Sequence, residues 1–169
     1  MPPETYPPRS ASGAPSTGGL LRDVVESDLD VLYEQQREPE AMRMALVPAR
    51  ERPAFDEHWK KVLARQDAIS KAIVYEGKVA GDALSWEQDG RRLIGYWLGR
   101  EYWGKGLATR ALAELVSVIA DRPLHAWVAT SNVGSVRVLE KNGFVRVETT
   151  VEHDDRLGRE VEIHLYELA

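Results

Sequence analysis

The segment Trp103–Leu112, WGKGLATRAL, restricts the fold of this chain more than any other, because two closely spaced glycines stand where an apolar helix begins. From Leu107 onward apolar residues recur every four positions, so they form one stripe of a helix, which must end before Pro123. Strand-like apolar runs, 93–98 and 124–129, precede and follow this helix. A helix between two strands favours a parallel strand pair in one sheet.

The rest of the sequence alternates between strand and helix patterns. Branched and aromatic runs separated by turn residues predict hairpins, whereas apolar spacings of three and four predict helices. We predict strands at 20–25, 69–75, 79–86, 93–98, 124–129, 144–151 and 160–168, and helices around 29–33, after Pro53 to about Arg65, at 107–119 and at 132–141. Residues 42–47 show no clear pattern. The predicted architecture is an α+β domain with a mixed, mostly antiparallel sheet of about seven strands and helices on both faces.

The length of the chain indicates a single domain. Its 169 residues suffice for one compact core but not for two ordinary domains, so we predict one domain over residues 19–169. Residues 1–18 are rich in proline, serine, glycine and threonine and offer few side chains to bury, so we predict a flexible leader. This leader lacks the charged start and apolar run of a secretory signal.

Charge and composition argue against several classes of function. The net charge is -5 with acidic and basic residues intermixed, so we expect no nucleic-acid partner. No run approaches about 18 apolar residues, so we expect no membrane span and a cytoplasmic protein. The chain has no cysteine, which excludes disulfides, thiolate metal ligands and a cysteine-bound acyl intermediate. The spacing of its four histidines suggests no metal site.

The two glycines, Gly104 and Gly106, suggest a use for the start of this helix. Without side chains they let the backbone approach a ligand, and the free amides of the first helical turn attract anions such as a diphosphate. Their spacing fits neither the dinucleotide-binding fingerprint nor the phosphate loop. A turn that merely lets the helix pack on the sheet is the alternative that the glycines alone leave open.

A second segment, Asn132–Phe144, NVGSVRVLEKNGF, adds to this pattern. Together with 103–108 it resembles the two motifs of the GNAT superfamily of N-acetyltransferases, in which spaced small residues are followed by an asparagine, another small residue and a glycine-phenylalanine pair. The matching residues are Gly106, Ala108, Asn132, Ser135, Gly143 and Phe144. The stretch 95–112 is especially similar to the Rim-type branch, which includes acetyltransferases of ribosomal-protein amino termini. The resemblance spans about residues 20–166.

The resemblance implies that acetyl-coenzyme A is bound as co-substrate between two central strands that splay apart. The pantetheine arm would lie along one strand, the pyrophosphate on the helix start, and an amide near Leu98 would polarise the thioester carbonyl. The residues so implied are Trp97, Leu98, Gly99, Trp103, Gly104, Lys105, Gly106, Leu107, Ala108, Thr109, Asn132 and Ser135. Asn132 would hold an amide of the arm, and a role as helix cap is compatible with this.

Ser135 is the candidate catalytic residue, because Rim-type members have a serine here that hydrogen-bonds or protonates the departing sulfur. The alternative is a small helix residue bonded to its own backbone. The chain departs from the family at Leu139, where many members have a tyrosine acting as general acid. It also departs at Trp127, where some have a glutamate base, and at Trp103, which replaces the usual basic residue.

No general base is identified. The candidates are Glu87, Glu152, His153 and His125, although His125 is equally interpreted as a buried imidazole and 152–155 as a solvated turn. A site without a clear base favours an amine of low pKa, since at pH 7 an α-amine is neutral in roughly one part in ten and a lysine in roughly one part in a few thousand.

We therefore expect acetyl transfer to a primary amine, either a peptide amino terminus or a small molecule. Two alternatives stay open: a coenzyme A-binding sensor or interaction module without chemistry, and an antibiotic-modifying acetyltransferase. A homodimer is compatible with the sequence.

Overall fold

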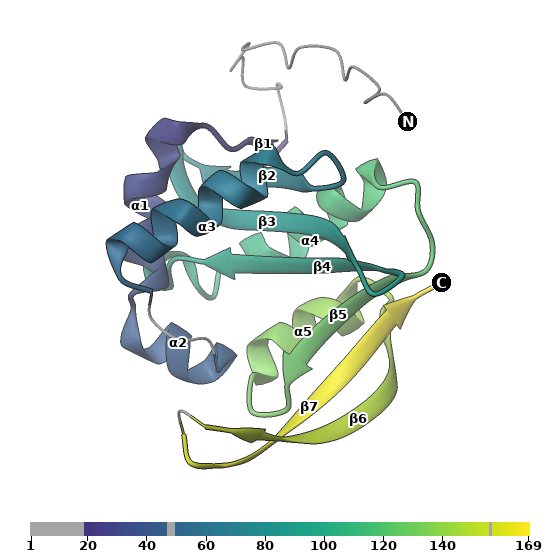
Figure 1. The fold of residues 1–169 in the computed structure, drawn as a ribbon. Helices are drawn as coiled ribbons and strands as arrows, with labels where there is room; N and C mark the ends of the chain where they lie inside the picture. Colours follow the sequence, from purple (N-terminus) through teal and green to yellow (C-terminus); the bar gives the residue numbers. More distant parts are fainter. Residues whose placement is uncertain (1–18, 47–49, 156) are drawn as a thin grey trace, which may run out of the picture.

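A computed structural model describes residues 19–46, 50–155 and 157–169 of the chain (Figure 1). The predicted leader, residues 1–18, lies outside the described residues. The elements are β1 (Leu21–Asp23), α1 (Leu29–Gln36), α2 (Pro39–Ala45), α3 (Arg52–Ala64), β2 (Ile69–Tyr75), β3 (Lys78–Gln88), β4 (Arg91–Leu98), α4 (Leu107–Val118), β5 (Leu124–Ala129), α5 (Val133–Lys141), β6 (Val145–Asp154) and β7 (Arg159–Leu168).

All seven strands belong to one sheet, in the order β1-β2-β3-β4-β5-β7-β6. Neighbouring strands are antiparallel except β4 and β5, which are parallel because α4 connects them. Strands β2, β3 and β4 form the meander that the turn residues predict. The α+β architecture and the mixed sheet are thus confirmed.

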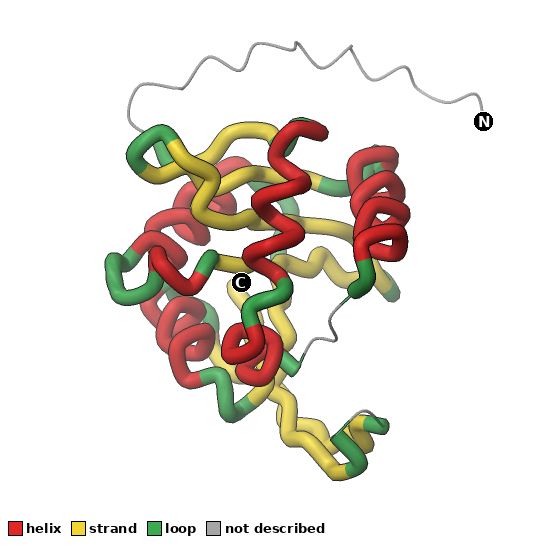
Figure 2. The backbone as a smooth tube through the Cα atoms, turned by 90° about the vertical axis from the view of Figure 1, so that its left-hand side faces the viewer, coloured by secondary structure: helices red, strands yellow, loops and turns green. Residues whose placement is uncertain are grey.

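Helices cover both faces of the sheet, as predicted (Figures 1 and 2). Helices α4 and α5 pack on one face, and the α4 residues Leu107, Leu112 and Leu115 are almost completely buried there. Helices α1 and α3 pack on the other face around Phe55 and Trp59. Each such side chain contributes about 1.5–3 kcal/mol by leaving water, so the two helix layers hold the sheet in place.

Helix α2 occupies a region for which the sequence shows no pattern. It begins with Pro39, whose missing amide hydrogen costs nothing in a first helical turn. The Glu38 carboxylate caps the helix by accepting a hydrogen bond from the Ala41 amide at 2.7 Å. Its seven residues make only two turns, too few for an apolar period to stand out.

The last hairpin is longer than the sequence predicts. We predicted that its first strand ends at Val151, but β6 continues to Asp154. Glu152 and His153 pair with β7 and are strand residues, so their interpretation as part of a solvated turn is wrong. Strand β6 lies at the edge of the sheet and is exposed along most of its length, and polar residues therefore do not interrupt it.

Candidate active site

The sheet opens between its two central strands. The parallel strands β4 and β5 are paired at Arg92 with Leu124 and at Leu93 with His125. Strand β4 nevertheless runs on to Leu98, and in the described part of the chain no further pairing joins it to β5. The expected splayed pair is therefore present, and the far half of β4 borders a gap.

The backbone of β4 presents specific groups to this gap. The Gly99 amide donates a hydrogen bond to the Ala80 carbonyl of β3 at 2.8 Å. Because successive backbone groups of a strand point to opposite sides, the Leu98 amide and carbonyl are directed away from β3. The Leu98 carbonyl accepts a hydrogen bond from the Trp103 indole at 2.9 Å. The Leu98 amide is thus directed toward the gap.

The turn before α4 places two glycines in the left-handed region of backbone space. Gly104 has a φ of 75° and Gly106 a φ of 72°, and a Cβ added to either would meet no atom within 4 Å. Helix-to-sheet packing therefore does not explain these glycines, whereas the left-handed conformation does. The first bond within the helix runs from the Arg110 amide to the Gly106 carbonyl at 3.2 Å. The amides of residues 107–109 precede it and can hold an anion.

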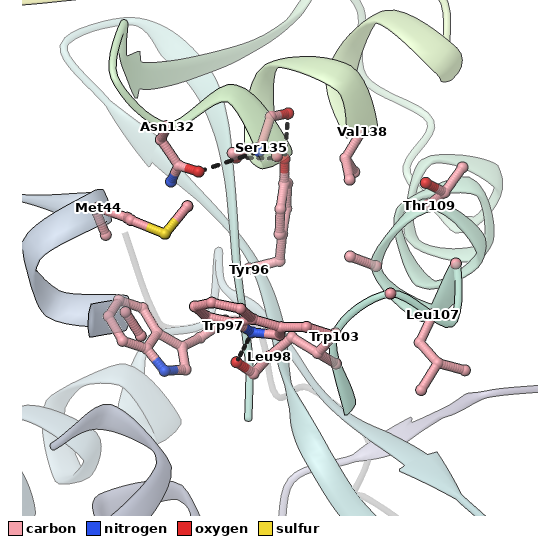
Figure 3. Close-up of a pocket in the computed structure, with 16 residues that line it drawn as sticks. Met44, Tyr96, Trp97, Leu98, Trp103, Leu107, Thr109, Asn132, Ser135 and Val138 are labelled. Atoms are coloured by element: carbon pink, nitrogen blue, oxygen red, sulfur yellow. Dashed lines mark hydrogen bonds between the residues drawn. The ribbon is translucent and has the colours of Figure 1, made fainter. Parts of the chain in front are cut away.

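The gap and the start of α4 face one cleft of about 280 Å³, which we name the central cleft (Figure 3). Its walls come from α2, β4, the turn before α4, and the first turns of α4 and α5. The residues that line it are Ala41, Met44, Ala45, Tyr96, Trp97, Leu98, Trp103, Gly104, Gly106, Leu107, Ala108, Thr109, Asn132, Gly134, Ser135 and Val138.

The polar groups of the central cleft are held by hydrogen bonds at the start of α5. The Asn132 side-chain oxygen accepts from the Ser135 amide at 3.1 Å, so this asparagine caps the helix. The Ser135 hydroxyl lies 2.7 Å from the Tyr96 hydroxyl of β4. Burial raises the pKa of the Tyr96 phenol to about 12, and the hydrogen bond with Ser135 offsets part of that rise. Tyr96 therefore stays protonated at neutral pH.

A family model described as an acetyltransferase (GNAT) domain matches residues 20–145, well over half of the chain. This chain belongs to the GNAT acetyltransferase family. The match covers the splayed strands, the turn with both glycines and the whole of α5, so the central cleft lies within the GNAT domain.

Relatives of this GNAT chain include one curated protein and several solved structures. An uncharacterized N-acetyltransferase p20 from Bacillus licheniformis is 30% identical over 87 residues, which are 48% of this chain and 48% of that protein. The chain thus matches about half the length of this curated relative. The structure of spermidine N-acetyltransferase from Vibrio cholerae, in complex with coenzyme A and spermine, has a TM-score of 0.77 at 17% identity and covers 88% of this chain and 93% of that one.

A Rim-type protein is among the structural neighbours. RimL, a ribosomal-protein α-N-acetyltransferase in complex with coenzyme A, has a TM-score of 0.74 at 18% identity and covers 88% of this chain and 92% of that one. At such identities the likeness supports the GNAT fold alone, and RimL stands beside neighbours of other kinds. Membership of the Rim-type branch therefore stays a proposal.

The GNAT domain brings most of the predicted coenzyme-binding residues to the central cleft. Those lining it are Trp97, Leu98, Trp103, Gly104, Gly106, Leu107, Ala108, Thr109, Asn132 and Ser135. Gly99 and Lys105 do not line it, because the Gly99 amide is paired with β3 and the Lys105 side chain is exposed. The predicted helix cap at Asn132 is present.

The four candidate bases fall into two groups. Glu87 and His125 line neither the central cleft nor a second cleft that adjoins it. His125 lies where β4 and β5 are still paired, and its ring bonds the Glu167 carboxylate at 3.1 Å. Glu87 lies beyond this paired end, beside Asp67 and Arg65. Both positions place the side chains away from the open half of the gap.

Glu152 and His153 line a second cleft of about 410 Å³, which we name the acidic cleft. It lies between the end of α2, β5 and the hairpin of β6 and β7, and Ala45 lines both clefts. Three carboxylate residues, Glu152, Asp154 and Asp155, and the partly exposed ring of Trp127 line it. The lining therefore favours a cationic molecule with some apolar surface.

Sequence reasoning did not predict the contact between Tyr96 and Ser135, and it did not predict α2 as a helix. Strand alternation could have placed Tyr96, since it shares a face of β4 with Ile94, whose side chain packs against the layer of α4 and α5. For α2, the proline and the Glu38 cap were the available signals.

In the described ranges, no group of three or more His, Cys, Asp or Glu side chains is placed to hold a metal ion. No described helix is long and apolar enough to cross a membrane.

Proposed function

We propose that this chain is an acetyl-coenzyme A-dependent N-acetyltransferase that moves the acetyl group directly to a primary amine in a ternary complex. The observation that carries the proposal is that the unpaired half of β4 and the glycine turn before α4 face the same cleft. A strand edge suits the amide-containing arm of coenzyme A, and a helix start suits its pyrophosphate.

In this proposal each part of the co-substrate has its own partners. The backbone amides of residues 104–109 hold the pyrophosphate. The edge of β4 and the side-chain amide nitrogen of Asn132 bind the pantetheine arm. The Leu98 amide donates to the thioester oxygen as negative charge develops there. The Ser135 hydroxyl donates to the sulfur, and no metal ion takes part.

We further propose that the acceptor amine enters through the acidic cleft. Its carboxylates and Trp127 suit a cationic amine, and Ala45 marks the place where it adjoins the central cleft. Structural neighbours have been solved with spermine and with the aminoglycoside ribostamycin, which are both amines. Glu152 or His153, which line this cleft, is the group that accepts the proton of the amine.

A second candidate function is a coenzyme A-binding module without chemistry. The observation that favours it is Leu139, which is almost completely buried in the core and offers no hydroxyl where many family members have their general acid. This candidate function has the same coenzyme A site as the acetyltransferase, but it predicts no acetyl transfer.

One experiment separates these functions. Calorimetry with coenzyme A and acetyl-coenzyme A measures binding, and a thiol-release assay with peptide amino termini, spermine and aminoglycosides measures transfer. We expect binding and amine-dependent thiol release. Binding with no release across the panel selects the non-catalytic module, and no binding by folded protein excludes both.

Light scattering tests the homodimer, and fractionation of the cells that make the protein tests the cytoplasmic location.

A further inference from the structure

The hydroxyl groups of Tyr96 and Ser135 come from different elements and meet inside the central cleft (Figure 3). Tyr96 extends from β4 and Ser135 lies in the first turn of α5. Their oxygens are 2.7 Å apart, and the Tyr96 hydroxyl is also 3.1 Å from the Ser135 backbone carbonyl. This tyrosine lies outside the groups that bind the co-substrate in the proposed reaction.

The hydrogen bonds allow two arrangements of the protons. In the first, Tyr96 donates to the Ser135 hydroxyl oxygen, and the serine proton is available to a third group in the cleft. In the second, Tyr96 donates to the Ser135 carbonyl, and the Ser135 hydroxyl donates its proton to the Tyr96 oxygen. The two hydroxyl oxygens, 2.7 Å apart, are closer than the Tyr96 hydroxyl and the Ser135 carbonyl, which are 3.1 Å apart. Both arrangements contain a hydrogen bond between the two hydroxyl groups.

The position of Ser135 in the helix makes an outside partner important. A serine within a helix commonly bonds a carbonyl in the preceding turn, but Ser135 is the third residue of α5 and has no complete helical turn before it. Its amide is already used by the Asn132 cap. Tyr96 is thus the side chain that fixes the direction of the Ser135 hydroxyl.

The described lining of the central cleft offers three hydroxyl groups: those of Tyr96, Thr109 and Ser135. Thr109 lies in the first turn of α4, among the amides suited to the pyrophosphate. The reacting end of the thioester is therefore left with the Tyr96–Ser135 pair. Leu139, one turn further along α5, is buried and contributes no polar group.

We propose that Tyr96 is a positioning residue, which holds the Ser135 hydroxyl with its proton directed at the departing sulfur. The inference rests on the proposed function. In the reaction a nitrogen-carbon bond forms, the carbon-sulfur bond breaks, and the proton lost by the amine ends on the sulfur, so nothing is oxidised or reduced. Ser135 donates to the sulfur as its charge grows, and Tyr96 donates to Ser135.

The acidity of the two hydroxyl groups makes both of them hydrogen-bond donors in this reaction and not the source of the proton, because the serine alcohol is an even weaker acid than the Tyr96 phenol. The phenol's pKa of about 12 is well above the value near 8.5 of an ordinary thiol, so transfer from the phenol to a thiolate is unfavourable. A phenol that stays protonated is a constant hydrogen-bond donor. The pH dependence of turnover then comes from the amine and its base.

The test combines Tyr96→Phe, Ser135→Ala and the double variant. We expect Tyr96→Phe to lower kcat about 10-fold, with changes below about 2-fold in coenzyme A affinity and in the KM of the amine. The double variant should match Ser135→Ala, because Tyr96 acts through the serine. Between pH 6 and 9 the profile of kcat should keep its shape. Tyr102→Phe, a half-buried tyrosine outside both clefts, is the matched control and should retain wild-type kcat.

Several outcomes overturn the inference while leaving the proposed function intact. These are an unchanged kcat in Tyr96→Phe, additive losses in the double variant, or a coenzyme A affinity that falls as much as kcat. If Tyr96→Phe does not fold, Ser135→Ala tests the same pair of hydroxyl groups by removing the other member. Wild-type kcat in that variant overturns the proposal. Failure of the proposed function is different, because wild-type protein itself would then release no thiol.

Discussion

Leu93 of β4 and His125 of β5 are the last partners that pair across the centre of the sheet. Strand β4 has five residues beyond this pair and β5 has four, so the gap is bounded on both sides by regular strand. Strands that remain extended keep their backbone groups directed sideways even without a partner. The sheet itself therefore supplies an edge for an extended ligand in the middle of the molecule.

The glycine before α4 gives a direct test of the coenzyme site. Gly106→Val should lower coenzyme A affinity at least about 10-fold in calorimetry, since a branched side chain would stand where an anion approaches the helix start. It should also destabilise the fold, because a non-glycine residue in the left-handed region costs about 1–2 kcal/mol.

Gly90→Val is the matched control for this strain. Gly90 has a similar φ of 74° and equally open space around it, but it lies in the turn between β3 and β4 and lines neither cleft. We expect a similar fall in thermal stability with unchanged coenzyme A affinity. Equal affinities in the two variants would contradict a role for Gly106 in binding.

The acidic cleft predicts a charge-dependent acceptor site. The double variant Glu152→Gln/Asp155→Asn should raise the KM of a cationic amine about 3- to 10-fold and leave coenzyme A affinity unchanged, because both carboxylates are exposed and each interaction is weak. The effect should shrink as salt is added.

Glu148→Gln/Glu162→Gln is the control for this pair, since it removes two charges from the same hairpin outside the cleft. A KM that rises equally in both double variants would point to the overall charge of the protein and against a local acceptor site.

The buried Asp82 of β3 predicts an unusual dependence of stability on pH. Burial raises the pKa of its carboxyl to about 7. The unfolded value is near 3.9, so the folded state binds this proton more tightly. The contribution of Asp82 to stability is therefore fully present below about pH 4 and is lost as the pH rises through about 7. Asp82→Asn should raise the free energy of unfolding at pH 8, by less than about 4 kcal/mol because the amide is also polar.

Chemical denaturation of Asp82→Asn at pH 5 and pH 8 measures this effect, with the exposed Asp121→Asn as control. We expect a flatter pH dependence in the Asp82 variant alone. An Asp82 variant that is less stable at both pH values would mean that the carboxylate has a partner it needs.

Asp28 predicts the opposite behaviour. Burial acts to raise the pKa of this carboxyl, but hydrogen bonds from Arg22 and the Val25 amide outweigh it and hold the pKa below its usual value. Its contribution to stability is therefore present above about pH 4 and is lost as the pH falls through the lowered pKa. Asp28→Asn should lower the free energy of unfolding at pH 7 by about 1–3 kcal/mol.

Asp30→Asn provides the comparison, because Asp30 pairs with Arg52 in an exposed ion pair. Such pairs contribute at most about 1 kcal/mol. Denaturation at pH 7 and pH 3 should show a large loss for Asp28→Asn at pH 7 that diminishes at pH 3. Similar small losses in both variants would contradict a special role of Asp28.

Local patterns in the sequence predicted the helix starts that face the central cleft. The glycines at 104 and 106 and the asparagine at 132 act through the backbone around them, and such effects depend on neighbours in the chain. The order of strands and helices also followed from local periodicity, and with it the parallel pair at the centre of the sheet.

Other features depend on contacts between distant segments. Tyr96 and Ser135 are 39 positions apart and meet through the sheet and α5, so nothing in the local sequence of either one marks the pair. Glu87 and His125 seemed suitable by residue type, but the register of β3, β4 and β5 places both away from the open half of the gap. Helix α2 was missed because seven residues are too few for a periodic signal.

Helix α2 gives both clefts a common border that does not belong to the sheet. Its residues Ala41 and Met44 face the central cleft, and Ala45 faces both. In the proposed function, changes in this short helix alter the size and shape of the amine that fits and leave the glycine turn and the strand edge as they are. Helix α2 therefore gives the proposed acceptor side a wall that can change independently of the coenzyme side.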